Sequence, residues 1–342
     1  MMSNGNGHTT MKDVARLAGV SPATVSLALG NDPRVNIKTR ELVREAADKL
    51  RYIPNEIGRS LRSQKTETIA LIIPNTSHHV FSHPYFAKLL EGITEVLNEN
   101  EYNLLLSTTA EESDEQSAYE KVLRNRRADG VIVSSASLYD RNFLRLVDSG
   151  FPVVYLGPWS NNDIYTVERD DVTGAFSATN HLLKLGRRKI VHFTGPLNHQ
   201  VWRDRLEGYR LAHQQNQISI NEELVIEKDL SVQAGYEGVA ELLDRQIPFD
   251  ALFAGNDLMA IGAMKQLLER GIKVPEQISV VGFDDIDMAS MFHPTLTTVH
   301  QPMKQTGILA AQKLLGVLNG REDIEKKTVL QTKLMIRESC GG

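Results

Sequence analysis

Residues 11–29 read Met11-Lys-Asp-Val-Ala-Arg-Leu-Ala-Gly-Val-Ser-Pro-Ala-Thr-Val-Ser-Leu-Ala-Leu29 and predict two short helices joined by a tight turn. Thr10 can start the first helix through a capping box, and Gly19 can end it as a left-handed glycine. Ser21 followed by Pro22 is a second helix start, because proline at the first helical position loses no hydrogen bond. Two helices separated by about three residues that include a glycine are typical of a helix-turn-helix.

Apolar residues at helical spacing predict a buried side for each helix of this N-terminal head. They are Val14, Leu17 and Ala18 in the first helix, Val25, Ala28 and Leu29 in the second, and Leu42, Val43, Ala46, Ala47 and Leu50 in a third helix capped by Asn36. The outward face of the second helix carries short side chains that can contact phosphates and thymine methyls, namely Pro22, Ala23, Ser26 and Leu27. An ordinary three-helix bundle would show the same apolar pattern.

The charge distribution also separates the head from the rest of the chain. Residues 1–65 contain eleven Lys or Arg and six Asp or Glu, a net charge of +5, whereas the remaining residues contain 27 and 37, a net charge of −10. A basic head on an acidic body indicates that the head binds a polyanion and the body does not. A chance fluctuation within 65 residues would account for the charge alone equally well.

Length and composition limit the class of protein. The 342 residues are enough for two or three domains, and 41% hydrophobic and 24% charged residues are ordinary for a globular chain. The one cysteine, Cys340, excludes an intramolecular disulfide and a multi-cysteine zinc site. Because no signal pattern or membrane-length apolar run is present, we expect a cytoplasmic protein without a membrane partner.

Beyond residue 66, short apolar runs alternate with amphipathic segments. The expected strands are 69–73, 104–107, 131–134, 153–156, 190–194, 251–254 and 279–283, and the expected helices include 86–99, 115–124, 174–185, 233–243, 258–270 and 305–318. Strand–helix alternation predicts an α/β body of parallel sheets covered by helices. A break near residues 157–165 divides it into two similar halves.

No catalytic motif for phosphate, dinucleotide, metal-hydrolase or serine-hydrolase chemistry is present, so we expect no enzyme and no cofactor. His78, His79 and His83 lie close together in a segment expected to be a loop. A metal site would need further ligands at fixed geometry, and a solvated or pocket-lining loop explains these histidines more simply.

The run from Met11 to Leu29, together with Arg51-Tyr-Ile-Pro-Asn55 and Arg59-Ser-Leu61, resembles the lactose/galactose-repressor family of bacterial helix-turn-helix regulators. The resemblance implies a small all-α helix-turn-helix head and a two-lobed, periplasmic-binding-protein-like body with parallel sheets. It also implies a disordered extension over residues 1–10, the helix-turn-helix domain over 11–54, a hinge helix and linker over 55–67, and an effector-binding and dimerisation domain over 68–342.

The resemblance assigns DNA contacts to matching positions. Ser21, Thr24, Ser26, Tyr52 and Asn55 would hold the DNA backbone, Pro22, Ala23 and Leu27 would face bases, and Arg34 is added as a basic residue of the head. In the hinge helix, Leu61 would wedge between base pairs beside Arg59. Leu27 replaces a common arginine, Gly30 replaces an asparagine, and Gly58 replaces an alanine within the hinge.

In the body, the matching segments are Gly195-Pro-Leu197, Arg205-Leu-Glu-Gly-Tyr209, Gly255-Asn-Asp257, Gly282-Phe-Asp-Asp285 and Thr298-Val-His-Gln-Pro302. The resemblance gives polar effector contacts to Arg205, Asn256 and Asp284, and further contacts to Tyr85, Phe86, Asp170 and Gln301. Asp257 is expected to cap the following helix, and Asp285 to be structural. The segment from Pro74 to Tyr85 is longer than in relatives, which suits either a larger ligand or a surface insertion.

These observations predict a ligand-responsive repressor of a carbohydrate-utilisation operon. Its expected partners are double-stranded operator DNA of near-palindromic sequence, a small-molecule effector such as a sugar, and a second copy of the chain, because paired heads read paired half-sites. The absence of the family's heptad tail favours a homodimer over a tetramer. The alternatives are a sugar-binding transport protein without a DNA role, and a sugar-acting enzyme.

Overall fold

The computed structural model describes residues 9–52, 65–110, 115–124, 127–134, 136–138, 140–159 and 163–341. The chain divides into two compact units, Met1–Lys65 and Thr66–Gly342, which are treated separately below.

Three helices form the first unit: α1 (Met11–Ala18), α2 (Pro22–Leu29) and α3 (Ile37–Lys49). Their starts follow the predicted caps. Asp13 accepts hydrogen bonds from the backbone N–H and hydroxyl of Thr10, Ser21 Oγ accepts from Thr24 N, and Asn36 Oδ1 accepts from Thr39 N. Gly19 ends α1 at a φ of 67°, a left-handed conformation that glycine adopts without strain.

The core of the head is narrower than its apolar pattern suggests. Val14, Val25 and Val43 are fully buried, one from each helix. Leu17 and Leu42, both predicted on the inner side, are each 52% exposed, so that part of the prediction is wrong. Three short helices bury only a narrow strip of small side chains between them. Leu17 and Leu42 lie at the edge of this strip and are therefore exposed to solvent.

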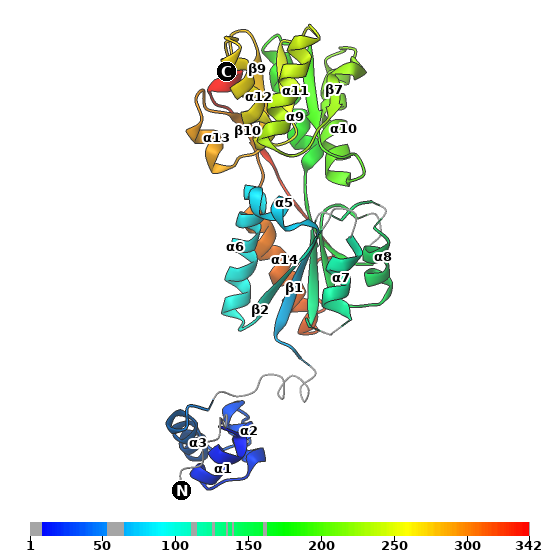
Figure 1. The fold of residues 1–342 in the computed structure, drawn as a ribbon. Coiled ribbons are helices and arrows are strands. Elements are labelled where there is room, and N and C mark those ends of the chain that lie inside the picture. The colour runs from blue at the N-terminus through cyan, green and yellow to red at the C-terminus, as the bar shows by residue number, and fades with distance from the viewer. Residues whose placement is uncertain are drawn as a thin grey trace. The chain divides into compact units, whose positions relative to one another are not determined.

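The second unit consists of two lobes, each built on a parallel sheet (Figure 1). The lobe 1 sheet has the order β11 (Lys327–Leu330), β5 (Tyr165–Arg169), β4 (Val153–Leu156), β3 (Gly130–Ser134), β1 (Thr68–Thr76) and β2 (Asn103–Thr109). Its helices are α5 (Ser77–Ser82), α6 (Pro84–Glu99), α7 (Glu115–Leu123), α8 (Arg141–Asp148) and α14 (Met303–Leu318).

Side-chain alternation along β1 explains the layers of lobe 1. Ile69 and Leu71 pack with the apolar residues of α6 and α14, whereas Ala70 and Ile72 pack with those of α7 and α8. Strands buried on both faces are continuous apolar runs, as in parallel sheets covered on each side by helices.

The lobe 2 sheet has the order β12 (Lys333–Met335), β10 (Thr297–His300), β9 (Ser279–Asp284), β8 (Ala251–Ala254), β6 (Ile190–Thr194) and β7 (Val225–Glu227), and only its β10–β12 pairing is antiparallel in the described part of the chain. Its helices are α9 (Asp171–Lys184), α10 (Gln200–Gln215), α11 (Val232–Asp244), α12 (Asp257–Glu269) and α13 (Asp287–Met291), with the short 3₁₀ turns Glu222–Leu224 and Glu338–Cys340. Leu252 of β8 packs with α11 and α12, and Phe253 packs with α9 and α10.

Along the described chain, the backbone passes between the lobes at 169–171, 300–303 and 330–333. The predicted break at 157–165 is therefore misplaced, because β5 begins at Tyr165 and still pairs with β4 of lobe 1. The boundary could not be seen in the sequence, because β5 leads directly into α9 although the two elements belong to different lobes.

The segment expected to be a loop around the three histidines is largely helical. Thr76 Oγ1 accepts a hydrogen bond from His79 N and caps α5, and Val80 is buried. Figure 1 places α5 at the end of lobe 1 that faces lobe 2. Among the described helices, none is long and apolar enough to cross a membrane.

Candidate effector cleft and nucleic-acid interface

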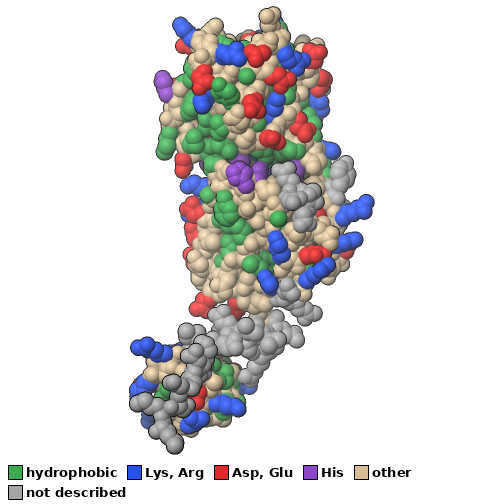
Figure 2. All heavy atoms as spheres, viewed as in Figure 1, with side chains coloured by type: hydrophobic (Ala, Val, Ile, Leu, Met, Phe, Trp, Pro, Cys, Tyr) green, Lys and Arg blue, Asp and Glu red, His purple; other side chains and the backbone are tan. Residues whose placement is uncertain are grey.

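Polar side chains from both lobes meet where their strands end. Arg169 ends β5, Asp284 ends β9, Gln301 follows β10, and Asn256 caps α12 two residues after β8. In open α/β sheets, ligands bind at the carboxyl ends of the strands, so these ends define a candidate effector cleft. Figure 2 shows histidine side chains gathered where the two lobes meet.

Arg205 of α10 is held beside these side chains by several contacts. Its Nε and Nη2 atoms each lie 2.9 Å from Asp171 Oδ1, and its Nη1 donates to the carbonyl oxygen of Gly255. The guanidinium carbon lies 3.7 Å from the centre of the Phe283 ring and 4.8 Å from that of Trp202. A buried, paired guanidinium stacked on aromatic rings is pre-oriented for a polar ligand.

Asp284 combines an unusual backbone with an unusual charge state. Its φ of 121° is rare for a residue with a side chain, and such strain concentrates at functional sites. Gln301 Nε2 donates to Asp284 Oδ1, and Arg205 Nη1 lies 3.8 Å from the same oxygen. Burial raises the pKa of Asp284 to about 7, although Arg205 and the Gln301 amide favour the ionised form.

Lobe 1 contributes an aromatic and cationic wall to the cleft. Arg169 Nη1 donates a 2.9 Å hydrogen bond to the hydroxyl of Tyr85, and the Tyr85 ring meets Phe86 edge-on at 5.1 Å. Both rings are buried. His83 Nε2 lies 3.2 Å from Asn256 Nδ2 and 3.7 Å from Asp284 Oδ2, so this histidine reaches lobe 2 directly.

Three acidic residues near the cleft have structural partners. Asp170 caps α9 by accepting from Thr173 N at 3.0 Å. Asp257 was predicted to cap α12, but Asn256 Oδ1 does so by accepting from Met259 N. Asp257 is fully buried and accepts from Ile286 N and the Thr298 hydroxyl.

Asp285 is structural, as predicted. Its Oδ1 accepts a 2.6 Å hydrogen bond from Arg337 Nη2, and its Oδ2 lies 3.0 Å from His300 Nδ1. This carboxylate therefore ties the end of β9 to β10 and to the last residues of the chain.

Sequence reasoning missed two residues of the cleft, Arg169 and Asp171, and it named His83 only as part of a solvated or pocket-lining loop. Arg169 had no clear sequence signal, because it ends β5, a strand of mixed polarity that was not among the predicted strands. Asp171 was passed over in favour of its neighbour Asp170, although only Asp171 reaches Arg205. Within the described residues, no group of His, Cys, Asp and Glu is arranged to hold a metal ion.

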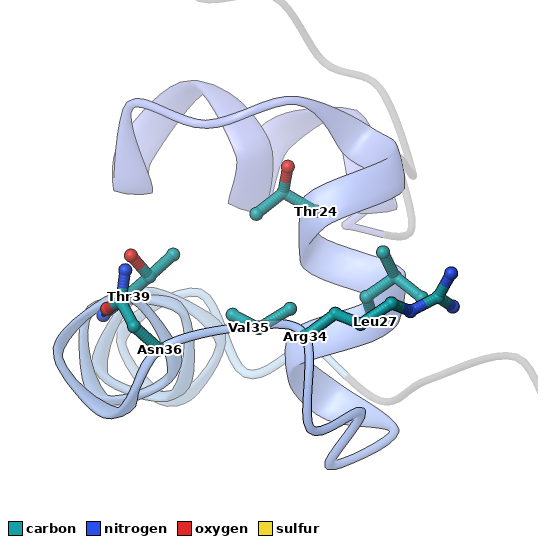
Figure 3. Close-up of a pocket in the computed structure, with 6 residues that line it drawn as sticks. All are labelled: Thr24, Leu27, Arg34, Val35, Asn36 and Thr39. Carbon is teal, nitrogen blue, oxygen red and sulfur yellow. Dashed lines mark hydrogen bonds between the residues drawn. The ribbon is translucent and has the colours of Figure 1, made fainter.

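In the head, α2 and the start of α3 enclose a hollow of about 270 Å³, lined by Thr24, Leu27, Arg34, Val35, Asn36 and Thr39. Figure 3 shows Thr24 and Leu27 on α2 opposite Asn36 and Thr39. The N-terminus of α3 therefore presents its positive dipole end beside α2, an arrangement that favours phosphate. Sequence reasoning used Asn36 only as a cap and missed it as a lining residue.

The other predicted DNA contacts differ in exposure. Ser21, Pro22, Ala23 and Arg34 are exposed, whereas Thr24, Ser26, Leu27 and Tyr52 are half-buried. Leu27 and Tyr52 pack partly against the head core. Arg34 donates from Nε and Nη2 to Asp32 at 2.9 and 2.7 Å. Asn55, Arg59 and Leu61 lie outside the described residues.

A helix-turn-helix head on a two-lobed body with a polar cleft defines a ligand-binding transcription regulator. Residues 10–55 match the family "Bacterial regulatory proteins, lacI family", and residues 179–340 match the periplasmic binding protein-like domain. The chain belongs to the lacI family of transcription regulators, which are not enzymes.

Similar proteins span almost the whole chain. The transcriptional regulator RegA of Clostridium saccharobutylicum is 34% identical over 97% of this chain and 99% of RegA, and CelR of Thermobifida fusca is 33% identical over 96% and 98%. The solved complex of CelR with cellobiose has a TM-score of 0.75 at 32% identity, covering 97% of this chain and 99% of CelR. The lac repressor dimer bound to operator and the anti-inducer ONPF has a TM-score of 0.86 at 27% identity, covering 98% and 99%.

Proposed function

We propose that this chain represses a carbohydrate-utilisation operon, binds a near-palindromic operator as a homodimer, and responds to a sugar held between its lobes. One observation carries the effector part of the proposal: Gln301 Oε1 is a buried acceptor in the cleft without a hydrogen-bond partner among the described residues. Arg169 Nε also makes no hydrogen bond there and has only an ion pair, 3.6 Å from Asp171 Oδ2. Buried polar atoms are rarely left unpaired. Because a hydroxyl group can both donate and accept, a ligand rich in hydroxyl groups suits the Gln301 Oε1 acceptor and the Arg169 Nε donor.

The charge and aromatic content of the cleft agree with such a ligand. Arg205 and Asp284 offer charge-assisted hydrogen bonds to hydroxyls, and Tyr85 and Phe86 provide apolar ring surface. Solved structures of similar proteins hold ligands of this class: CelR is in complex with cellobiose, and a LacI-family regulator of Enterococcus faecium has bound ribose. Asp170, Asn256 and Gln301 complete the proposed effector set.

DNA binding is assigned to the head and hinge. We propose residues 11–54 as the helix-turn-helix domain, preceded by an extension over 1–10, with 55–67 as the hinge and 68–342 as the effector and dimerisation domain. Leu27 would face the groove, and Thr24 would hold the DNA backbone while the start of α3 meets a phosphate. Arg59 and Leu61 would act in the minor groove. Since the partner is chromosomal DNA, the site of action is the cytoplasm.

The proposed control connects the cleft to the DNA. The backbone passes repeatedly between the lobes next to the cleft, so a sugar that contacts both lobes changes their relative position. Such a displacement at the hinge would alter a coil-to-helix transition in residues 55–67 and thereby operator affinity.

The test uses the full chain in two assays. Fluorescence anisotropy compares DNA from upstream of its own gene with random DNA of equal length, and we expect tighter binding that falls steeply with salt because counterions are released. Thermal-shift measurements then screen cellobiose, maltose, D-glucose, D-galactose and D-ribose. Equal affinity for both DNAs would refute operator recognition, and no thermal shift with any sugar would refute the sugar effector.

A further inference from the structure

Cationic side chains cover one side of lobe 1. Figure 2 shows Lys and Arg side chains gathered over α7 and α8. Five exposed cations belong to this part of the chain and are called the basic face of lobe 1 below: Lys121, Arg124, Arg127, Arg141 and Arg145. The net charge of −10 for residues 66–342 therefore conceals a cationic surface.

Helix geometry places these cations on the outside of the lobe. In α8, Phe143 is buried, whereas Arg141 and Arg145 are exposed and lie one turn apart on the opposite side of the helix. Directly after α7, Arg127 N donates to the carbonyl oxygen of Val122 at 3.3 Å, which fixes the backbone that carries this arginine. Both segments thus direct their guanidinium groups to solvent.

Two acidic residues of the same segments are already engaged. Glu120 pairs with Arg124 at 2.7 Å. Asp140 is buried, caps α8 and accepts a 2.6 Å hydrogen bond from the Tyr119 hydroxyl. Asp148, at the end of α8, is exposed and leaves the face with an excess of positive charge.

The basic face differs from other charged surfaces of the body in how its cations are paired. Many exposed cations elsewhere have carboxylate partners, as Lys304 does 3.0 Å from Glu91 and 2.8 Å from Glu95. In the described part of the chain, no carboxylate forms an ion pair with Arg127, Arg141 or Arg145. Their guanidinium donors remain available, and this planar group binds phosphate oxygens bidentately. Cations spread over two helices suit an extended chain of phosphates.

The basic face lies next to the point where the linker from the head enters lobe 1. Asp129, two residues after Arg127, accepts hydrogen bonds from Thr66 N and Glu67 N at 2.6 and 2.9 Å. Residues 53–65 connect this point to the head, and a fully extended segment of that length spans at most about 45 Å. DNA held by the head is therefore tethered within reach of lobe 1, which raises the local concentration of phosphates there.

We infer that the basic face of lobe 1 binds the phosphate backbone of DNA that flanks the operator. This inference rests on the proposed operator binding by the head. Phosphate contacts add affinity without reading sequence, so flanking DNA of any sequence serves. The effector domain then contributes to DNA binding itself, and not only through the linker.

The test measures how flanking DNA changes the affinity of the full chain. Base substitutions in DNA from upstream of its own gene define the operator, because phosphate contacts outside it are insensitive to sequence. Anisotropy titrations then compare an operator-only duplex with one that carries about 20 base pairs, or two helical turns, of random sequence on each side. We expect the wild type to bind the flanked duplex about tenfold more tightly at about 0.1 M salt. The slope of log affinity against log salt should be steeper by about 3 for three added phosphate contacts.

Two triple variants test whether the basic face causes this gain. The first combines Arg127→Gln, Arg141→Gln and Arg145→Gln. The matched control removes the same charge from exposed positions of lobe 2 and combines Lys184→Gln, Lys189→Gln and Lys273→Gln. We expect the arginine variant to bind both duplexes with affinities within about twofold of each other and to keep its affinity for the operator-only duplex. The lysine variant should retain the tighter binding of the flanked duplex, and both variants should keep the wild-type thermal midpoint.

The possible failures are distinguishable. Equal wild-type affinity for the two duplexes would overturn the inference while operator binding stands, and would leave the basic face to a partner other than DNA. A preference for the flanked duplex that persists in the arginine variant would assign the flank contacts to other residues and also overturn it. Wild-type affinity for the upstream DNA no higher than for random DNA would overturn the proposed operator binding together with this inference.

Discussion

Arg205 and Asp171 form a buried ion pair in which Arg205 Nε and Nη2 each lie 2.9 Å from Asp171 Oδ1. The pair joins the first residue of α9 to the middle of α10, directly under the cleft. The ion pair fixes the position of the Arg205 guanidinium at the effector site, and it also makes Arg205 necessary for the fold.

Substitution of Arg205 should therefore reduce stability as well as effector response. Arg205→Ala removes the closer of the two guanidinium groups that pair with the buried carboxylate of Asp171 and leaves Arg169 Nε, 3.6 Å from Asp171 Oδ2. We expect a loss of about 3 kcal/mol in the free energy of unfolding, measured with urea. Arg203→Ala, at an exposed position of the same helix, should change it by less than about 1 kcal/mol. A loss below about 1 kcal/mol for Arg205→Ala would mean that water replaces the pair.

Acid should destabilise the chain through His83. Burial lowers the pKa of His83 from 6.5 to about 4 in the folded chain. Below pH 6.5 His83 is protonated in the unfolded state but stays neutral in the folded state. Proton binding therefore favours the unfolded state, and the free energy of unfolding decreases as pH falls toward 4. Between pH 7 and 4 the wild type should lose up to about 3 kcal/mol more than His83→Asn, measured by urea unfolding.

The matched control for this pH effect is His78→Asn. Because His78 is exposed, this variant should follow the wild-type curve. Parallel curves for wild type and His83→Asn would show that His83 titrates normally in the folded chain.

Asp32 should restrain DNA binding by the head. The Arg34 guanidinium holds the pKa of Asp32 well below its usual range. Arg34 is a predicted DNA contact, and its ion pair with Asp32 keeps the guanidinium engaged within the head. Asp32→Asn keeps an acceptor for the backbone N–H of Arg34 while removing the charge. We expect a few-fold tighter operator binding at low salt in anisotropy titrations, with the gain shrinking as salt rises. Weaker binding would assign Asp32 a positioning role instead.

Gly92 should not tolerate alanine. A Cβ at this position would collide with the carbonyl oxygen of Lys304, because α6 and α14 approach closely there. Helix propensity alone predicts that Gly92→Ala gains about 1 kcal/mol, whereas the collision should cost about 1–3 kcal/mol. A decrease in the urea midpoint is expected, and an increase would show that the helices can separate freely.

Local features of the fold were predictable from the sequence. The caps at Thr10, Ser21 and Asn36 depend on residues three positions away, so the sequence alone shows them. The buried strands were predictable because runs such as 69–73 are long and uniformly apolar.

Other features depend on contacts that the sequence does not display. The helix α5 has no apolar periodicity and relies on its Thr76 cap and on burial of Val80 by lobe 1. The pairing of Arg205 with Asp171, rather than with Asp170, follows from how α9 packs on α10. The contacts of His83 with Asn256 and Asp284 require the positions of three residues from both lobes, and no spacing rule encodes them.

The alternation of the chain between the lobes sets the order in which the protein can assemble during translation. The edge strand β11 of lobe 1 ends at Leu330, and lobe 2 is completed by β12 and by the Ser339 hydroxyl bonded to the Val280 carbonyl oxygen. Neither lobe can be finished until nearly all of the chain has left the ribosome, roughly 15–50 s after the head has been made. A ribosome that stops early therefore releases a complete head without a complete effector domain, and a cell must remove such fragments before they occupy DNA unregulated.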